Sequence, residues 1–328
     1  MIKIGQIGIG HNHGTGKMSA VRKFPDLFQV IGYAEDNEEW VQKRGQLSCY
    51  ADLPRLSEAE LLAQCDAILV ECDVWNLTKT AQRCIDAGKH IHMDKPASGT
   101  LEEYKTLLDT AKAKNLTVQL GYMYRYNPAI RKCMELVESG ALGEIFSINA
   151  EMSTRHTDEY REWLRHFSGG TMYIFGCHLI DLIVKILGKP ETVITRNKHS
   201  GLNGIDVADN CFALLDYKNA TAKVTTASVE NNGWGRRQFV VCGTKGTVEI
   251  KPLEIPTTMT LSTSEMITND YAVCKQDIEI PDTPSEIRYD QMMLEFAAIL
   301  QGEKPNPYSY DHEYAVQEVL LRAISEST

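Results

Sequence analysis

The stretch IKIGQIGIGHNHG, residues 2–14, decides how this chain is interpreted. An apolar run leads into Gly8 and Gly10, and a helical pattern follows from about Gly16 to Phe24. Gly8 permits a tight turn, and Gly10 lets the main chain approach a phosphate closely. The following helix offers free backbone N–H groups and a positive dipole end. This order predicts a Rossmann domain that holds a dinucleotide through Gly8, Ile9, Gly10, His11 and Asn12.

The cofactor is predicted from the end of the second strand. The usual fingerprint has a third glycine where this chain has His13, but the strand FQVIGYAE (28–35) ends on Glu35. A carboxylate there accepts hydrogen bonds from the adenosine ribose and repels a 2′-phosphate. Asp36 adds a negative charge, and no arginine adjoins these acids in the sequence. We therefore expect NAD, with NADP less favoured.

The rest of the chain separates into two patterns. Up to residue 124 strands alternate with helices, as in βαβ units around a parallel sheet. Beyond it, β-rich stretches follow one another across turns such as GTKG (243–246), which indicates an antiparallel sheet. The fold class is therefore α/β: a dinucleotide-binding Rossmann domain at 1–124 and an α+β domain at 125–328, built on a large, mainly antiparallel sheet.

Composition excludes several classes of partner. The net charge is −10, from 34 basic and 44 acidic residues, which argues against nucleic acid. Nine scattered cysteines without a CxxC pair are typical of reduced thiols in the cytoplasm. The longest apolar stretch, residues 173–188, contains three charged or imidazole side chains and is too polar to span a membrane. With no signal peptide visible at residue 1, a cytoplasmic location is expected.

A second motif resembles a known family. KHIHMDKP (89–96) resembles the Lys-Pro signature of the Gfo/Idh/MocA oxidoreductases, usually Glu-Lys-Pro and here Asp94-Lys95-Pro96. Three further stretches resemble that family in order along the chain: 121–145, 169–190 and 295–305. The resemblance implies an NAD-dependent dehydrogenase that acts on a CH–OH group of a sugar, polyol or related hydroxyl or carbonyl compound. It also implies a homodimer or homotetramer, formed through the second domain.

The same resemblance assigns roles to individual residues. Lys95 ends a central strand, at the sheet edge where ligands bind, and the family implies a cis Lys95–Pro96 bond. Lys95 is expected to handle the proton of the substrate hydroxyl, together with His178 as a proton shuttle. Asp181 lies three residues further along the same helix face as His178. The candidates for binding the substrate are Arg125, Arg155, His156, Trp163 and Asp181. The candidates for binding the cofactor are the glycine loop, Glu35, Asp73, Asp94 and Lys95.

Three departures from the family pattern leave alternatives open. Many sugar dehydrogenases of the family have an aspartate where this chain has Ile174, and Thr-Pro-Asn often stands where it has residues 72–74. His11 and His13 are unusual in a phosphate loop. A metal held by them and a carboxylate is conceivable, but hydrogen-bonded histidines without a metal are favoured.

The sequence leaves two other functions open. One is an NAD-assisted lyase or glycoside-cleaving enzyme that oxidises its substrate transiently and shows no net redox change. The other is a sensor that binds a dinucleotide without catalysis. Retention of Lys95 and His178 argues against the sensor, because a sensor needs no proton relay.

Overall fold

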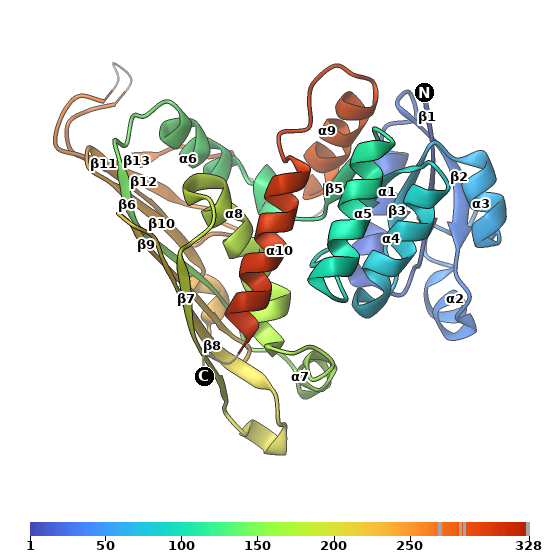
Figure 1. Cartoon of the computed structure of the whole chain (residues 1–328), viewed down its shortest axis with the longest axis horizontal. Helices are drawn as coiled ribbons and strands as arrows, with labels where there is room; N and C mark the ends of the chain where they lie inside the picture. Colours follow the sequence, from blue (N-terminus) through green and yellow to red (C-terminus); the bar gives the residue numbers. More distant parts are fainter. Residues whose placement is uncertain (268–270, 282–283, 285–286, 326–328) are drawn as a thin grey trace. The chain divides into compact units, whose positions relative to one another are not determined.

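The computed structural model describes residues 1–267, 271–281, 284 and 287–325. The chain forms two compact units, which Figure 1 draws in colours that follow the sequence. The first unit comprises Met1–Met123 and Ser285–Tyr314, and the second comprises Tyr124–Pro284 and Ala315–Thr328. Among the described residues, no helix is long and apolar enough to cross a membrane.

The first unit is a parallel five-stranded sheet with the order β2-β1-β3-β4-β5, as the sequence predicts. The apolar strand β3 is buried along its whole length, as expected for a strand covered on both faces. Helices α3 and α5 each begin at a capping box, which satisfies their first free N–H groups. The elements are β1 (Ile2–Ile7), α1 (Asn12–Arg22), β2 (Phe28–Ala34), α2 (Glu38–Arg44), α3 (Glu58–Gln64), β3 (Ala67–Val70), α4 (Leu77–Asp86), β4 (His90–Met93), α5 (Leu101–Ala113) and β5 (Val118–Leu120).

A segment from the far end of the chain completes this unit. Helix α9 (Asp290–Leu300) packs against α1, and it buries Met292 and Phe296 completely. Gln119, in strand β5, donates a hydrogen bond to the carbonyl of Met292. The predicted boundary after residue 124 lies one residue from the observed one, but residues 285–314 were placed in the second domain. An apolar helix pattern does not reveal which of two cores it will cover, and this explains the difference.

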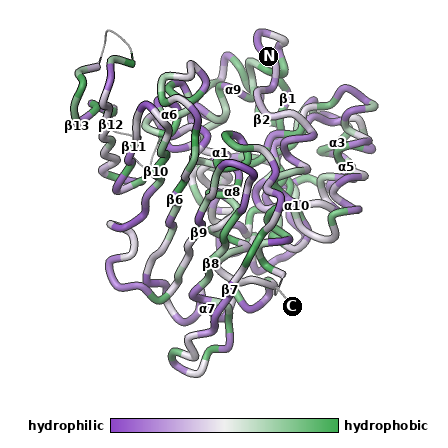
Figure 2. The backbone as a smooth tube through the Cα atoms, turned by 60° about the vertical axis from the view of Figure 1, so that its left-hand side comes forward, coloured by the Kyte–Doolittle hydropathy of each residue, from purple (hydrophilic) through white to green (hydrophobic). Residues whose placement is uncertain are grey.

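The second unit contains an eight-stranded sheet with the order β13-β12-β11-β10-β6-β9-β8-β7. All neighbours are antiparallel except β6 and β9, so the prediction of a large, mainly antiparallel sheet is confirmed. Hydrophobic and hydrophilic stretches alternate along these strands in Figure 2. The strands are β6 (Ile145–Ser153), β7 (Thr192–His199), β8 (Ala208–Asp216), β9 (Thr221–Ala227), β10 (Gln238–Gly243), β11 (Gly246–Ile250), β12 (Met259–Thr263) and β13 (Lys275–Ile278).

Helices of the second unit pack on this sheet and carry its candidate residues. Helix α8 (Cys177–Leu187) contacts β6 and β9, and α6 (Pro128–Glu138) contacts β11. A buried π-helical segment, Met172–Gly176, leads directly into α8. Such segments occur often at functional sites, because they shift the side chains that follow. The remaining helices are α7 (Asp158–Leu164) and α10 (Tyr310–Ile324), which crosses the boundary between the units.

Candidate functional site

The glycine loop stands at the carboxyl edge of the parallel sheet, where the strand order changes direction between β1 and its two neighbours. Gly8 has φ +88°, and a side chain there would lie 2.4 Å from the backbone of Cys72. Gly14 is similarly tight, because an added Cβ would lie 2.9 Å from Nε2 of Gln6 and 3.1 Å from the Cβ of Glu71. The close approach of helix to strand therefore falls on Gly14, one residue after the position where the fingerprint places its third glycine.

Glu35 is held beside this loop by backbone donors. Its Oε2 accepts a hydrogen bond from the N–H of Ile9 at 2.9 Å, and its Oε1 accepts one from the N–H of Asn37. Each carboxylate oxygen has two lone pairs, so both can accept a further hydrogen bond from a ribose hydroxyl. The Glu35 side chain is thus positioned for the role that the sequence predicts.

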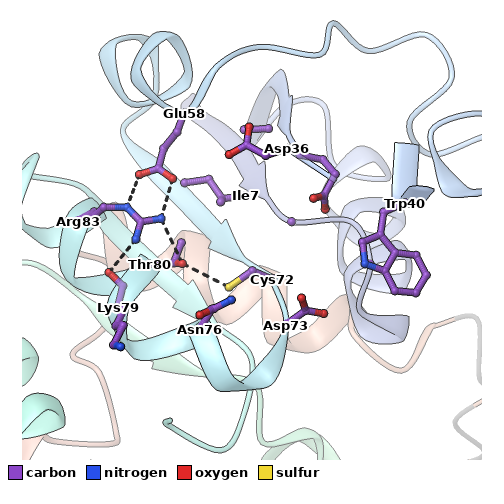
Figure 3. A pocket seen from close by; sticks show the side chains of 14 residues that line it. Ile7, Asp36, Trp40, Glu58, Cys72, Asp73, Asn76, Lys79, Thr80 and Arg83 are labelled. Atoms are coloured by element: carbon purple, nitrogen blue, oxygen red, sulfur yellow. Dashed lines mark hydrogen bonds and ion pairs between the residues drawn. The ribbon is translucent and has the colours of Figure 1, made fainter. Parts of the chain in front are cut away.

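A cleft of about 310 Å³ opens next to Gly8, Gly10 and Glu35. Figure 3 shows Trp40 and Asp73 on one side of this cleft and the Glu58–Arg83 ion pair on the other. Trp40 approaches the glycine loop closely, because a methyl group added at Gly10 would lie 2.5 Å from its indole Nε1. The complete lining is Ile7, Gly8, Gly10, Ala34, Glu35, Asp36, Trp40, Glu58, Cys72, Asp73, Asn76, Lys79, Thr80 and Arg83.

One basic side chain, that of Arg55, lies near Glu35 and Asp36 and was not predicted from the sequence. The Nε of Arg55 donates to the carbonyl of Glu35 at 3.0 Å, and the same guanidinium pairs with Glu38 at 2.7 Å. Arg55 is 20 residues from Glu35 along the chain, so adjacency in the sequence does not reveal it. Its charge also interacts with Asp36.

Behind the glycine loop lies a group of charged and imidazole side chains, named here the Lys17 cluster: Lys17, Glu71 and Asp94, which are buried, with His11 and His13, which are partly exposed. The fully buried ammonium of Lys17 lies 2.8 Å from Oε1 of Glu71 and 3.0 Å from Oδ1 of Asp94. Oδ2 of Asp94 is approached by Nδ1 of His11 at 2.7 Å and Nδ1 of His13 at 3.1 Å. The cluster joins helix α1 to the ends of β3 and β4.

Burial and charge shift the pKa values within the Lys17 cluster in different directions. Burial raises the pKa of Glu71 to about 8, although Lys17 opposes the shift. Burial would also raise the pKa of Asp94, but Lys17 and the two histidines hold it well below its usual range. Burial lowers the pKa of His13 to about 3, so this imidazole is neutral at pH 7. Asp94 is therefore the anion of the cluster, and Lys17, His11 and His13 all lie against its carboxylate.

Lys95 follows Asp94 directly, at the carboxyl end of β4. The N–H of Asp94 donates to the carbonyl of Val70, which ties this segment to β3. The Lys95–Pro96 bond is cis, as the family resemblance implies, and the lysine side chain is buried. Asn12 begins helix α1, but its side chain lies outside the described part of the structure.

In the second unit, His178 and Asp181 are both buried in α8. The ring of His178 lies 5.3 Å from that of Tyr124, centre to centre. Asp181 accepts two hydrogen bonds from Arg125, at 2.9 Å from Nε and 2.6 Å from Nη2. This fork satisfies a buried guanidinium and a buried carboxylate together. Two predicted substrate residues therefore bind each other.

A polar chain continues from Tyr124. Its hydroxyl donates to Oε1 of Glu254 at 2.5 Å, and the same oxygen accepts a hydrogen bond from Arg237. Burial and the neighbouring Glu254 raise the pKa of Tyr124 well above its ordinary value. The guanidinium of Arg237 also lies 3.9 Å from the centre of the Trp234 ring. Neither Glu254 nor Arg237 belongs to a sequence motif, so neither was predicted as a site residue.

The stretch 155–170 includes helix α7, whose N-cap is Thr157. His156 stacks on Tyr160 and Phe175, with ring centres 4.1 and 5.2 Å away, and burial lowers its pKa to about 4. Trp163 packs between the rings of Tyr160 and Phe167. Arg155 is exposed and donates to the carbonyl of Val229. His156 and Trp163 thus share one aromatic group, while Arg155 lies apart from it.

Each of the two units matches a family of known proteins. Residues 2–122 match the family model described as oxidoreductase family, NAD-binding Rossmann fold, and residues 130–249 match the GFO/IDH/MocA C-terminal domain. An uncharacterized oxidoreductase of Escherichia coli, YhhX, is 31% identical over 170 residues, which are 51% of this chain and 47% of that protein. The scyllo-inositol 2-dehydrogenase (NADP(+)) IolW of Bacillus subtilis is 29% identical over 137 residues, 41% of this chain and 38% of IolW.

A solved structure extends the likeness to the whole fold. UDP-N-acetylglucosamine 3-dehydrogenase GnnA from Acidithiobacillus ferrooxidans has a TM-score of 0.79 and 18% identity, covering 98% of this chain and 96% of GnnA. At this identity the likeness shows the fold alone. The aligned parts of YhhX and IolW span half or less of their lengths.

Proposed function

The chain belongs to the GFO/IDH/MocA family of NAD(P)-binding oxidoreductases, and from this premise we propose that it is a dehydrogenase of a CH–OH group in a sugar, polyol or related compound. One observation carries the proposal: a glycine loop, the carboxylate of Glu35 and a Lys-Pro motif meet at the carboxyl edge of one parallel sheet. Bound nicotinamide dinucleotide supplies the C4 atom that accepts or returns a hydride.

Binding of the dinucleotide would use groups that are already oriented. The N-terminus of α1 would face the pyrophosphate, and Glu35 would accept the ribose hydroxyls. Trp40 and Asp73 line the same cleft. The indole ring of Trp40 would cover the bound adenosine and exclude water from it. The chain has four tryptophans, so the part of the fluorescence change that is lost in Trp40→Phe gives a readout of binding in this cleft.

The proton of the substrate hydroxyl would be managed by Lys95 and His178. As hydride leaves the carbon, the hydroxyl proton passes to the Lys95 amine, and the carbonyl forms. His178 would exchange that proton with solvent or bind a neighbouring hydroxyl. We also propose that His156 and Trp163 bind the substrate, with Arg155 at the periphery. Arg125 would position α8 through its bond to Asp181.

The test is turnover with NAD across a panel of sugars and polyols. Lys95→Met should reduce turnover by roughly 10²–10⁴-fold, the usual contribution of an acid–base group. Quenching of Trp40 fluorescence by NAD should stay unchanged in this variant, and Lys112→Met, an exposed lysine on α5, is the matched control. Near-normal turnover of Lys95→Met would reject the proposed mechanism.

The same assay separates dehydrogenation from redox-neutral chemistry. A dehydrogenase forms one NADH for each substrate consumed. Transient oxidation followed by elimination consumes substrate without accumulating NADH. Stoichiometric NADH is the expected result, and substrate loss without it would establish the lyase alternative.

We propose that NAD binds at least about tenfold more tightly than NADP, equivalent to about 1.4 kcal/mol. Glu35 and Asp36 support this preference because they repel a 2′-phosphate. Arg55 supports the alternative, since its guanidinium lies beside the same residues, although Glu38 already pairs with it. Calorimetry with both cofactors decides between them. Arg55→Gln should leave NAD affinity unchanged, and a large loss of NADP affinity in that variant would show that Arg55 binds the phosphate.

A homodimer or homotetramer is proposed through one face of the eight-stranded sheet. Ile194 on β7 lies opposite Leu214 on β8, and Phe212 follows at the next position on that face. All three are partly or largely exposed. Covering them with a second copy would remove apolar surface from water. Light scattering at micromolar concentration should show a dimer or tetramer, and a monomer there would contradict this expectation.

A further inference from the structure

The two histidines of the glycine loop and Asp94 form a group with metal-binding chemistry. One ring nitrogen of His11, one ring nitrogen of His13 and a carboxylate oxygen of Asp94 all lie within 4.8 Å of one another. Two imidazoles and one carboxylate are a donor set that binds zinc, iron and related divalent ions, often with further positions left open. His11 is the N-cap of α1, His13 lies in the first turn of that helix, and Asp94 follows the end of β4.

The distances are close to those of a coordinated ion. A tetrahedral zinc ion with bonds of 2.0–2.1 Å holds its ligand atoms about 3.3 Å apart. Oδ2 of Asp94 lies 2.7 Å from Nδ1 of His11 and 3.1 Å from Nδ1 of His13. Small movements of the histidines would open the required space. The His13 side chain is 30% exposed and has room to move, whereas Asp94 is completely buried.

Lys17 fixes the carboxylate in the orientation that such a site needs. Its ammonium lies 3.0 Å from Oδ1 of Asp94, and Oδ2 is the oxygen nearer to both imidazoles, although Nδ1 of His13 also lies 3.3 Å from Oδ1. A group that holds the second oxygen of a ligating carboxylate orients the first, and such outer partners strengthen metal binding. Lys17 belongs to α1, and its side chain is buried against the residues that follow β3 and β4.

The hydrogen bonds around His11 also favour a cation at this point. In the structure its Nδ1 accepts a hydrogen bond from the backbone N–H of His13 at 3.3 Å as the N-cap of α1, and an ion bound at Nδ1 would take over this lone pair. The same nitrogen lies 2.7 Å from Oδ2 of Asp94, another acceptor. Two acceptors at that distance repel each other unless a proton or a metal ion lies between them.

The charges nearby are mixed in sign. Glu71 and Asp94 face Lys17, and Asp73 interacts with both Glu35 and His11. The guanidinium of Arg44 donates to the carbonyl of His11 at 3.3 Å, on the main-chain side of this residue. The negative charge that a cation would meet directly is therefore the carboxylate of Asp94.

We propose that His11, His13 and Asp94 bind one divalent transition-metal ion through the two Nδ1 atoms and Oδ2. Three protein ligands leave an open position, as in catalytic metal sites. If the proposed dehydrogenase function holds, that position takes the hydroxyl oxygen of the substrate. The ion then makes the hydroxyl more acidic, its proton passes to Lys95, and the hydride passes to nicotinamide C4 as the carbonyl forms. Metal binding itself does not depend on that function.

The experiment uses the full chain, stripped with a chelator and titrated with Co²⁺ without any dinucleotide. Visible absorption follows the Co²⁺, and thiolate ligation would appear as a separate, intense near-ultraviolet band. The expected result is one Co²⁺ per chain without the thiolate band. His11→Ala and His13→Ala should each weaken binding at least about 100-fold, since loss of outer partners alone costs 10–100-fold.

His199→Ala is the matched control, because His199 also pairs with a carboxylate, Asp206, but on the exposed surface. This variant should bind Co²⁺ like the parent. The proposal would be overturned if Co²⁺ did not bind stoichiometrically, or if binding were unchanged in His11→Ala and His13→Ala. The imidazoles would then interact with Asp94 through hydrogen bonds. Fluorescence titration with NAD, done separately, reports on the cofactor site, so failure of the metal site and of the proposed function remain distinguishable.

Discussion

The two units each bury ion pairs, but the pairs are built differently. In the Lys17 cluster one ammonium serves two carboxylates, and the partly exposed imidazoles of His11 and His13 complete it. In the second unit two parallel hydrogen bonds join the guanidinium of Arg125 to the carboxylate of Asp181 on α8, and we call this pair closed. The first arrangement keeps groups that can turn toward a ligand. The second joins its two charges directly and ties α8 to the segment before α6.

Removing the central charge of the open cluster should have the largest effect. Lys17→Met leaves two buried carboxylates without their common cation, and breaking a buried pair typically costs about 3–5 kcal/mol. Urea unfolding followed by circular dichroism should show this loss. The exposed Lys112→Met serves as the control and should change stability by less than about 0.5 kcal/mol. A loss below about 1 kcal/mol for Lys17→Met would mean that water or rearrangement compensates the cluster.

The closed pair should respond in a different way to a compensating change. Arg125→Met alone leaves Asp181 buried without this partner, and we expect a loss of about 3 kcal/mol. The double variant Arg125→Met/Asp181→Leu should recover most of that stability, because apolar residues often replace a buried pair without cost. The corresponding double variant Lys17→Met/Glu71→Gln should recover less, since Asp94 stays charged. Equal recovery in both units would remove the distinction between open and closed pairs.

The smallest effect concerns the half-buried imidazole of His156, which belongs to neither of these groups of ion pairs. Burial lowers the pKa of His156 from 6.5 to about 4. Between these values the unfolded chain takes up a proton that the folded chain does not, so stability falls as the pH falls from 6.5 toward 4. His156→Phe keeps the stacking on Tyr160 and Phe175 and should reduce this dependence by about 1–2 kcal/mol, allowing for partial exposure. Unfolding midpoints measured at pH 4.5 and 7.5 test it, and an unchanged pH dependence would contradict it.

Local patterns account for what could be predicted. Gly8 and Glu35 each lie at the end of a predicted strand, and in the structure Glu35 hydrogen-bonds to the loop that contains Gly8. The cis bond before Pro96 was implied by the family motif and is present. Gly14, by contrast, was not predicted to lie at the close contact of helix and strand, because the fingerprint places that contact at position 13. Trp40 and Arg55 were also missed, because each approaches the site from an element that carries no motif.

The sequence by itself determined the parallel Rossmann unit, the mainly antiparallel second sheet and the glycine loop, because these depend on residues close together in the chain. Tertiary structure alone decided the Lys17 cluster, whose central lysine is 54 residues from Glu71 and 77 from Asp94. The strand order places the ends of β1, β3 and β4 side by side, and only then do their polar residues meet. The return of residues 285–314 to the first unit was decided in the same way, since an apolar helix face can cover any core of complementary shape.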